Sequence, residues 1–319
     1  MEVFDVYKDI QARTNGEIYL GVVGPVRTGK STFIKRFMDL LVLPKMEDEH
    51  DRERTRDELP QSASGKTIMT TEPKFVPNEA VSIKTEEGIE LNVRLIDCVG
   101  YMVEGATGHM EGEEERLVKT PWFDYEIPFT KAAAIGTKKV ITEHSTIGVV
   151  VTCDGSFGEI AAKQYEPAEE ETIKQLKALK KPFVVLLNTI HPYSESTKQL
   201  AAEKEEKYQT KVLPMNLEQM KKEDIYEIIK SVLMEFPISS IGFYVPRWTE
   251  MLKKDHPLKM ELLQMARDVI TEKTTMRDIY EEQEKEYEYI TGQKLESSCD
   301  GQWGMGHHSK SWGCIYYEF

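Results

Sequence analysis

Residues 24–31 read Gly-Pro-Val-Arg-Thr-Gly-Lys-Ser. The run before them, Ile18–Val23, is apolar and β-prone, and the run after them, Thr32–Met38, has helical periodicity. A strand, a glycine-rich loop and a helix in this order are typical of a P-loop, whose backbone N–H groups and helix N-terminus surround a phosphate. The sequence therefore predicts a site for a nucleoside triphosphate.

The loop contains residue types suited to holding a triphosphate. Gly24 and Gly29 allow the positive φ angles that fold N–H groups around an anion. Lys30 can reach the β- and γ-phosphates, and the Ser31 hydroxyl can ligate Mg²⁺. Arg27 is either a second charge near the phosphates or an exposed side chain. The predicted nucleotide-binding residues are Gly24, Pro25, Val26, Arg27, Thr28, Gly29, Lys30, Ser31, Thr32, Gly100 and Asn188.

Composition excludes several classes of function. A net charge of −14 argues against a nucleic-acid partner and against purely electrostatic attraction to anionic lipid. No apolar stretch approaches the roughly 20 residues of a membrane span, and the segment Met1–Asp5 lacks the features of a signal peptide. Four scattered cysteines are too few for a disulfide framework, so we expect a cytoplasmic protein.

Alternating strand and helix patterns organise the first 240 residues. Such alternation predicts a doubly wound α/β domain with a mostly parallel sheet, whose ligand binds at the C-terminal ends of the strands. The charged segment 45–54 is predicted to be a solvated loop or an exposed helix. The predicted strands are 18–23, 90–96, 146–151, 182–187 and 210–213, and the predicted helices are 29–43, 166–180, 195–207 and 221–235.

The chain changes character after Phe236-Pro237, so we predict a P-loop domain at 1–240 and the start of a smaller, largely helical domain at 241–319. A helix at 257–290 is expected to pack an apolar stripe on a core. The segment 299–319 holds two Cys and two His, but their spacing matches no standard zinc pattern, and a disordered or irregular tail is expected. The stripe is formed by Leu258, Leu262, Met265 and Val269.

Two further features favour hydrolysis. Asp97 follows an apolar strand, where its carboxylate can hold a Mg²⁺-bound water opposite Ser31, and the N–H of Gly100 can approach the γ-phosphate. Thr70 and Thr71 lie on a polar loop, and one of them can give its hydroxyl to Mg²⁺ and its backbone to the γ-phosphate. The sequence leaves open which threonine does so. The predicted catalytic residues are Lys30, Asp97, Thr70 and Thr71.

Nucleotide identity is argued from residues 188–191, Asn-Thr-Ile-His. In P-loop GTPases the corresponding strand ends in Asn-Lys-x-Asp, and the Asp accepts two guanine N–H bonds. A neutral imidazole at His191 cannot accept both bonds, which favours ATP over GTP. Tyr101 stands where a water-orienting Gln is common, so slow catalysis is expected unless a residue from elsewhere in the chain or from a partner completes the site.

Four segments together resemble the stage IV sporulation protein A family. They are residues 24–32, 67–77 (Thr-Ile-Met-Thr-Thr-Glu-Pro-Lys-Phe-Val-Pro), 95–101 (Leu-Ile-Asp-Cys-Val-Gly-Tyr) and 188–192 (Asn-Thr-Ile-His-Pro). The resemblance runs from Met1 to about Gln293, and the end of the chain departs from it. We therefore interpret the chain as a C-terminally truncated or frame-altered member.

The resemblance implies a domain built like translation-factor-type GTPases that hydrolyses ATP. In that family hydrolysis drives self-assembly into the basement layer of the spore coat, in the mother-cell cytoplasm at the forespore surface. A small amphipathic peptide, stage V sporulation protein M, recruits the protein to the membrane there. The implied partners are further copies of the chain, this peptide and coat proteins, with peripheral membrane association at most. By position, Lys30 and Ser31 are the P-loop contacts, Asp97 is the magnesium-side acid, and Thr70 and Thr71 are the sensor threonines.

Two alternatives remain open at this point. A reversible GTP-binding switch would bind GTP in preference to ATP. A structural scaffold with a non-hydrolysing nucleotide site would release no phosphate.

Overall fold

The computed structural model describes residues 17–46, 48–60, 72–84, 90–106, 108–111, 114–158, 160–237, 247–272, 274–280, 296–298 and 314–316. The chain divides into two compact units. One comprises residues 16–232, and the other comprises residues 233–319 with residues 1–15. The predicted domain boundary at residue 240 stays a prediction.

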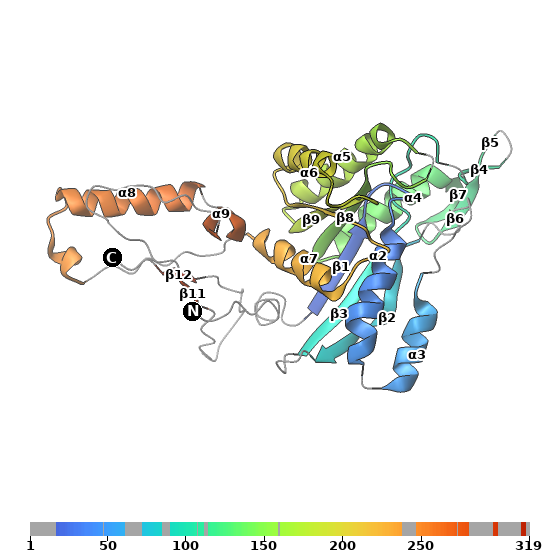
Figure 1. Cartoon of the computed structure of the whole chain (residues 1–319), viewed down its shortest axis with the longest axis horizontal. Coiled ribbons are helices and arrows are strands. Elements are labelled where there is room, and N and C mark those ends of the chain that lie inside the picture. Colours follow the sequence, from blue (N-terminus) through green and yellow to red (C-terminus); the bar gives the residue numbers. More distant parts are fainter. Residues whose placement is uncertain are drawn as a thin grey trace. The chain divides into compact units, whose positions relative to one another are not determined.

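A six-stranded sheet forms the centre of the first unit, in the order β10-β9-β8-β1-β3-β2 (Figure 1). Neighbouring strands are parallel except for β2, which pairs antiparallel with β3. Every residue of β8 and β9 is buried, as expected for parallel strands covered on both faces. The predicted doubly wound, mostly parallel α/β fold is therefore confirmed. The strands are β1 (Glu17–Val23), β2 (Lys74–Lys84), β3 (Glu90–Asp97), β8 (Ile147–Cys153), β9 (Phe183–Asn188) and β10 (Val212–Met215).

Helices cover both faces of this sheet. The P-loop helix α2 (Lys30–Phe37) continues as a π-helical turn η1 (Met38–Val42) and a 3-10 turn η2 (Leu43–Lys45), and it lies with α7 (Lys222–Met234) on one face (Figure 1). The other face is covered by α4 (Phe129–Lys139) with its π-helical extension η3 (Val140–His144), α5 (Ala162–Ala178) and α6 (Glu195–Tyr208).

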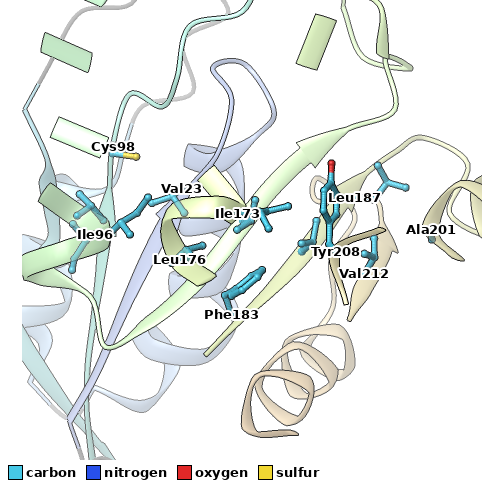
Figure 2. Close-up of a cluster of buried hydrophobic side chains, with 14 residues drawn as sticks. Val23, Ile96, Cys98, Ile173, Leu176, Phe183, Leu187, Ala201, Tyr208 and Val212 are labelled. Carbon is cyan, nitrogen blue, oxygen red and sulfur yellow. The ribbon is translucent and has the colours of Figure 1, made fainter. Parts of the chain in front are cut away.

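The largest described cluster of buried apolar side chains lies between the sheet and η3, α5 and α6 (Figure 2). Alternate residues of the strands supply one side of the cluster, because successive side chains of a strand point to opposite faces. Ile173 and Leu176 of α5, three residues apart, lie against the strands from the helix side. This packing holds α5 against the sheet.

The structure adds elements that the sequence analysis did not predict. These are β2, α4 and two small antiparallel pairs: β4 (Met110–Glu111) with β5 (Glu114–Glu115), and β6 (Leu117–Thr120) with β7 (Phe123–Pro128). The charged segment after the P-loop helix is the exposed-helix alternative, α3 (Glu49–Glu58). Asp48 caps this helix by accepting a hydrogen bond from the Asp51 N–H at 3.0 Å.

The second unit contains η4 (Arg247–Met251), α8 (Pro257–Glu272), α9 (Met276–Tyr280), and the antiparallel strands β11 (Glu296–Ser298) and β12 (Cys314–Tyr316). The predicted stripe is buried at Leu262, Met265 and Val269. The single helix predicted at 257–290 is wrong, since the chain leaves the helix before Thr274 and restarts at Met276. There the Asp278 carboxylate accepts hydrogen bonds from the N–H groups of Thr274 and Thr275 at 2.9 and 2.8 Å, which caps a new helix.

Residues 281–290 of the predicted helix lie outside the described residues, as do residues 299–313 and 317–319 of the predicted tail. In the described part of the tail, Cys314–Tyr316 pairs with Glu296–Ser298 as a short antiparallel strand, and the prediction for the rest of the tail stays a prediction.

Candidate nucleotide site

The loop between β1 and α2 has the backbone that a phosphate cradle requires. Gly24 and Gly29 have φ of 128° and 99°, and Arg27 between them has φ of 63°. A Cβ at Gly24 would lie 2.4 Å from the Val151 carbonyl oxygen, so only glycine fits there. The Thr28 hydroxyl donates to the Pro25 carbonyl at 3.0 Å and holds the turn from inside. Val26 and Thr28 are buried, Thr32 is half-buried and Arg27 is exposed.

The Lys30 ammonium points back into the loop. Its Nζ donates to the carbonyl oxygens of Pro25 at 2.6 Å and Gly24 at 3.4 Å. Burial lowers the pKa of Lys30, and the nearby Cys98 and Asp97 oppose this shift. A buried ammonium group has lost much of its hydration, so an anion that binds beside it stabilises its charged form. The arrangement is therefore suited to a polyphosphate.

Asp97, the last residue of β3, meets the start of α2. The Ser31 hydroxyl donates to Asp97 Oδ2 at 2.9 Å. Burial raises the pKa of Asp97, and Lys30 and Ser31 oppose the shift. Among the described residues, Asp97 Oδ1 is buried and has no hydrogen-bond partner. A buried, unpartnered carboxylate oxygen beside a hydroxyl fits Mg²⁺, which takes oxygen ligands and keeps several waters.

The segment after β3 lies directly against the P-loop. A Cβ at Gly100 would lie 2.1 Å from the Gly24 carbonyl oxygen and 2.6 Å from Lys30 Nζ, and φ of Gly100 is 94°. Tyr101 forms an isolated parallel bridge with Pro25. Asp97 is thus brought to Ser31 and Lys30, and Gly100, three residues later, is brought to Lys30.

Asn188, at the end of β9, joins three loops. Its Nδ2 donates to the Thr28 carbonyl at 3.0 Å, and its Oδ1 accepts from the Leu217 N–H at 3.2 Å. A Cβ at Gly29 would lie 2.6 Å from Asn188 Nδ2, which explains glycine at that position. The structure therefore places Asn188 as a brace for the P-loop. Its contact with a nucleotide base stays a prediction.

Two of the residues that follow Asn188, Thr189 and His191, differ in their exposure. Thr189 is fully buried, and its hydroxyl accepts the His191 N–H at 3.1 Å. His191 is exposed. The side chain at position 189 thus faces the protein interior.

Two predicted site residues, Thr70 and Thr71, lie outside the described residues, so the structure gives them no position. Two other residues near the P-loop were not identified from the sequence. Leu217 contacts Asn188 from the segment after β10, and its place at the C-terminal end of a neighbouring parallel strand is a signal that could have found it. Gln175, on α5, accepts a hydrogen bond from the Tyr101 hydroxyl, and nothing in the local sequence marks it.

Two family models together match most of the chain. The model of the stage IV sporulation protein A ATPase domain matches residues 1–237, and that of the middle domain of the same protein matches residues 238–306. The crystal structure of the SsGBP and GDP complex aligns with a TM-score of 0.38 and 13% identity, over 69% of this chain and 50% of that chain, which is too weak a likeness to bear on function. In the described part of the chain, no helix combines the length and apolar character needed to cross a membrane.

Three curated relatives carry the name stage IV sporulation protein A. The Bacillus anthracis protein is 47% identical over 95% of this chain, the Clostridioides difficile protein 54% over 86%, and the Bacillus subtilis protein 49% over 88%. The chain spans 62%, 56% and 57% of their respective lengths. Matches of this extent and identity show that the chain belongs to the stage IV sporulation protein A family.

Proposed function

We propose that this chain is a slow, Mg²⁺-dependent ATPase whose hydrolysis drives its self-assembly into the basement layer of the bacterial spore coat. The observation that carries the proposal is the Ser31–Asp97 hydrogen bond, 2.9 Å long, beside a P-loop that holds the Lys30 ammonium. The matched ATPase domain of a sporulation protein supports both the activity and the setting.

In the proposed mechanism the protein positions the triphosphate and neutralises its charge, and no side chain acts as a base. The P-loop N–H groups hold the phosphates, and Lys30 offsets the negative charge that develops between the β- and γ-phosphates. Ser31 and Asp97 would hold magnesium, with Asp97 acting through a water. When bound, the metal would polarise the phosphoryl oxygens. The N–H of Gly100 and the side chain of Thr70 or Thr71 are proposed to contact the γ-phosphate.

ATP is proposed as the nucleotide because the Lys and the Asp of the guanine-binding Asn-Lys-x-Asp pattern are missing. His191 cannot replace a carboxylate that accepts two N–H bonds, and the buried Thr189 cannot flank the ring. A guanine would therefore leave its ring N–H donors unpaired, which reduces discrimination in favour of GTP by orders of magnitude.

Assembly is proposed to follow from the loss of the γ-phosphate contacts. While the triphosphate is bound, these contacts order the loop that carries Thr70 and Thr71, and hydrolysis releases that loop. By family membership, the proposed partners are further copies of the chain, stage V sporulation protein M and coat proteins. The proposed location is the mother-cell side of the forespore surface.

The experiment compares the parent chain with Lys30→Ala and Asp97→Ala in phosphate release and in sedimentation after addition of Mg-ATP. Each variant is expected to lower phosphate release at least about 100-fold and to stay in the supernatant. Lys35→Ala, an exposed lysine on the same helix, is the matched control and should behave as the parent.

Three outcomes would overturn the proposal. Sedimentation of Lys30→Ala together with the parent would show that hydrolysis is not the trigger, and absence of phosphate release by the parent would favour a scaffold. In a competition experiment, GTP displacing ATP at lower concentration would favour the GTP switch.

A further inference from the structure

The backbone of Tyr101 is bonded to the P-loop at two points. Its N–H donates to the Gly24 carbonyl at 3.3 Å, and its carbonyl accepts the Val26 N–H at 2.9 Å. This bridge extends the pairing of β1 with β3 beyond Val22 and Asp97, the last paired residues of the two strands. The P-loop and the segment that carries Gly100 are thus connected by two backbone hydrogen bonds.

The side chain of Tyr101 is anchored on a different element. Its hydroxyl donates to Gln175 Oε1 at 2.7 Å, and Gln175 Nε2 donates to Glu171 Oε1 at 2.6 Å, one turn earlier on α5. The Tyr101 ring packs on a buried apolar cluster that includes Val26 of the P-loop. Burial raises the pKa of Tyr101 to about 12, so its hydroxyl keeps its proton at neutral pH.

The hydroxyl proton of Tyr101 is donated to Gln175 on α5, so this hydroxyl cannot at the same time donate to a water or a phosphate oxygen. α5 is in turn fixed to the sheet by Ile173 and Leu176 (Figure 2). The hydroxyl–amide bond therefore ties the segment after β3 to a rigid element.

We propose that Gln175 is a positioning residue: through the Tyr101 hydroxyl it holds Tyr101 and Gly100 against the P-loop, so that the γ-phosphate side of the site is ordered before the nucleotide arrives. The effect on catalysis rests on the proposed ATPase function. The ordering itself does not require turnover, so it can be measured separately.

The first test is hydrogen–deuterium exchange of the full nucleotide-free chain, followed by mass spectrometry of peptides that contain the Val26 and Tyr101 amides. Gln175→Leu and Tyr101→Phe each remove the bond and should accelerate exchange of these amides about fivefold, the effect of one net hydrogen bond. Because both changes remove the same bond, the double variant should exchange no faster than either single variant.

Two controls separate positioning from general damage. The double change Glu171→Gln with Gln175→Glu keeps an acceptor for the Tyr101 hydroxyl at position 175. It also keeps an amide–carboxylate hydrogen bond between positions 171 and 175 of α5, so the exchange rate should equal that of the parent. Lys174→Leu, an exposed neighbour on α5, should have no effect. Unchanged Val26 and Tyr101 amides in Gln175→Leu, or equal acceleration of amides in β8, would overturn the inference.

The second test measures steady-state ATP hydrolysis. Gln175→Leu should lower kcat about fivefold and leave KM within twofold, because Lys30 and Ser31 are untouched. If the parent hydrolyses ATP and Gln175→Leu has the same kcat as the parent, the role of Gln175 in catalysis is overturned. If the parent releases no phosphate, the proposed function fails, and the exchange experiment still decides whether Gln175 orders the segment.

Discussion

At the scale of single residues, the carboxylate of Asp97 is subject to two opposing requirements. Binding magnesium through water requires the ionised form, whereas burial raises the pKa of Asp97 above its ordinary value of 3.8. A group whose folded pKa is raised stabilises the fold fully below its unfolded pKa, and this stability is lost as pH rises through the folded pKa. The ionised carboxylate of Asp97 therefore destabilises the protein free of nucleotide and metal at neutral pH, while this same ionised form is the one that binding of magnesium requires.

The first prediction concerns Asp97→Asn, which keeps an acceptor for the Ser31 hydroxyl but carries no charge. In nucleotide-free, Mg²⁺-free buffer at pH 7 the variant should unfold at higher urea concentration than the parent, and the difference should vanish below about pH 4. Its ATP hydrolysis should fall at least about 100-fold. A parent more stable than the variant at pH 7 would contradict this account of Asp97.

The second prediction concerns Gly100→Ala. The new Cβ would meet the Gly24 carbonyl oxygen at 2.1 Å in a backbone with φ of 94°, so we expect a loss of about 1–3 kcal/mol of unfolding free energy together with most of the activity. Gly158→Ala is the matched control, because Gly158 has φ of 74° and no atom within 4 Å of its Cβ. It should lose about 1 kcal/mol and keep its activity. Equal activity losses in both variants would contradict a close approach at Gly100.

The residues of the site differ in how far the sequence could predict them. The sequence places Lys30 and Ser31 shortly after one predicted strand and Asp97 directly after another. The structure brings the three residues together, as that pattern implies. The Tyr101–Gln175 bond joins residues 74 positions apart, and it depends on how α5 packs on the sheet. No local pattern encodes such a contact.

At the scale of elements, α5 and α6 are joined by two ion pairs in different surroundings. Lys204 and Glu169 pair at 2.5 Å with side chains 10% and 1% exposed, and Thr152 of β8 donates to the same carboxylate. Lys207 and Glu170 also pair at 2.5 Å, but their side chains are 49% and 52% exposed. Because the two N–O distances are equal, the burial of the side chains should decide what each ion pair contributes to stability.

The third prediction compares Lys204→Met with Lys207→Met in urea unfolding. Lys204→Met leaves the Glu169 charge buried without its cation and should cost about 3–5 kcal/mol. Lys207→Met should cost less than about 1 kcal/mol, since water replaces its partner. Adding Glu169→Gln to Lys204→Met should recover much of the loss. Similar costs for the two single variants would contradict the role of burial.

The elements also show where the sequence was informative. Strands buried on both faces, such as Ile147–Cys153, form continuous apolar runs that can be recognised directly. The edge strand β2 contains Pro77 and a register shift between Val76 and Val81, so its alternation is broken and it was not predicted. The helix predicted at 257–290 failed because a side-chain cap at Thr275 and Asp278 overrides the apolar periodicity.

At the scale of the whole molecule, the first compact unit contains every described residue of the candidate nucleotide site. The two family models meet between residues 237 and 238, close to the change in character seen in the sequence. Nucleotide binding is therefore proposed as a property of the first unit.

The most direct measurement is calorimetric titration of the full chain with Mg-ATP, in parallel with Lys30→Ala and with EDTA in place of magnesium. The account predicts saturable binding of one nucleotide per chain by the parent, with affinity lowered at least about 100-fold by either change. Absence of binding by the parent, or affinity unaffected by loss of the Lys30 ammonium, would contradict the assignment of residues 24–31 as the phosphate cradle.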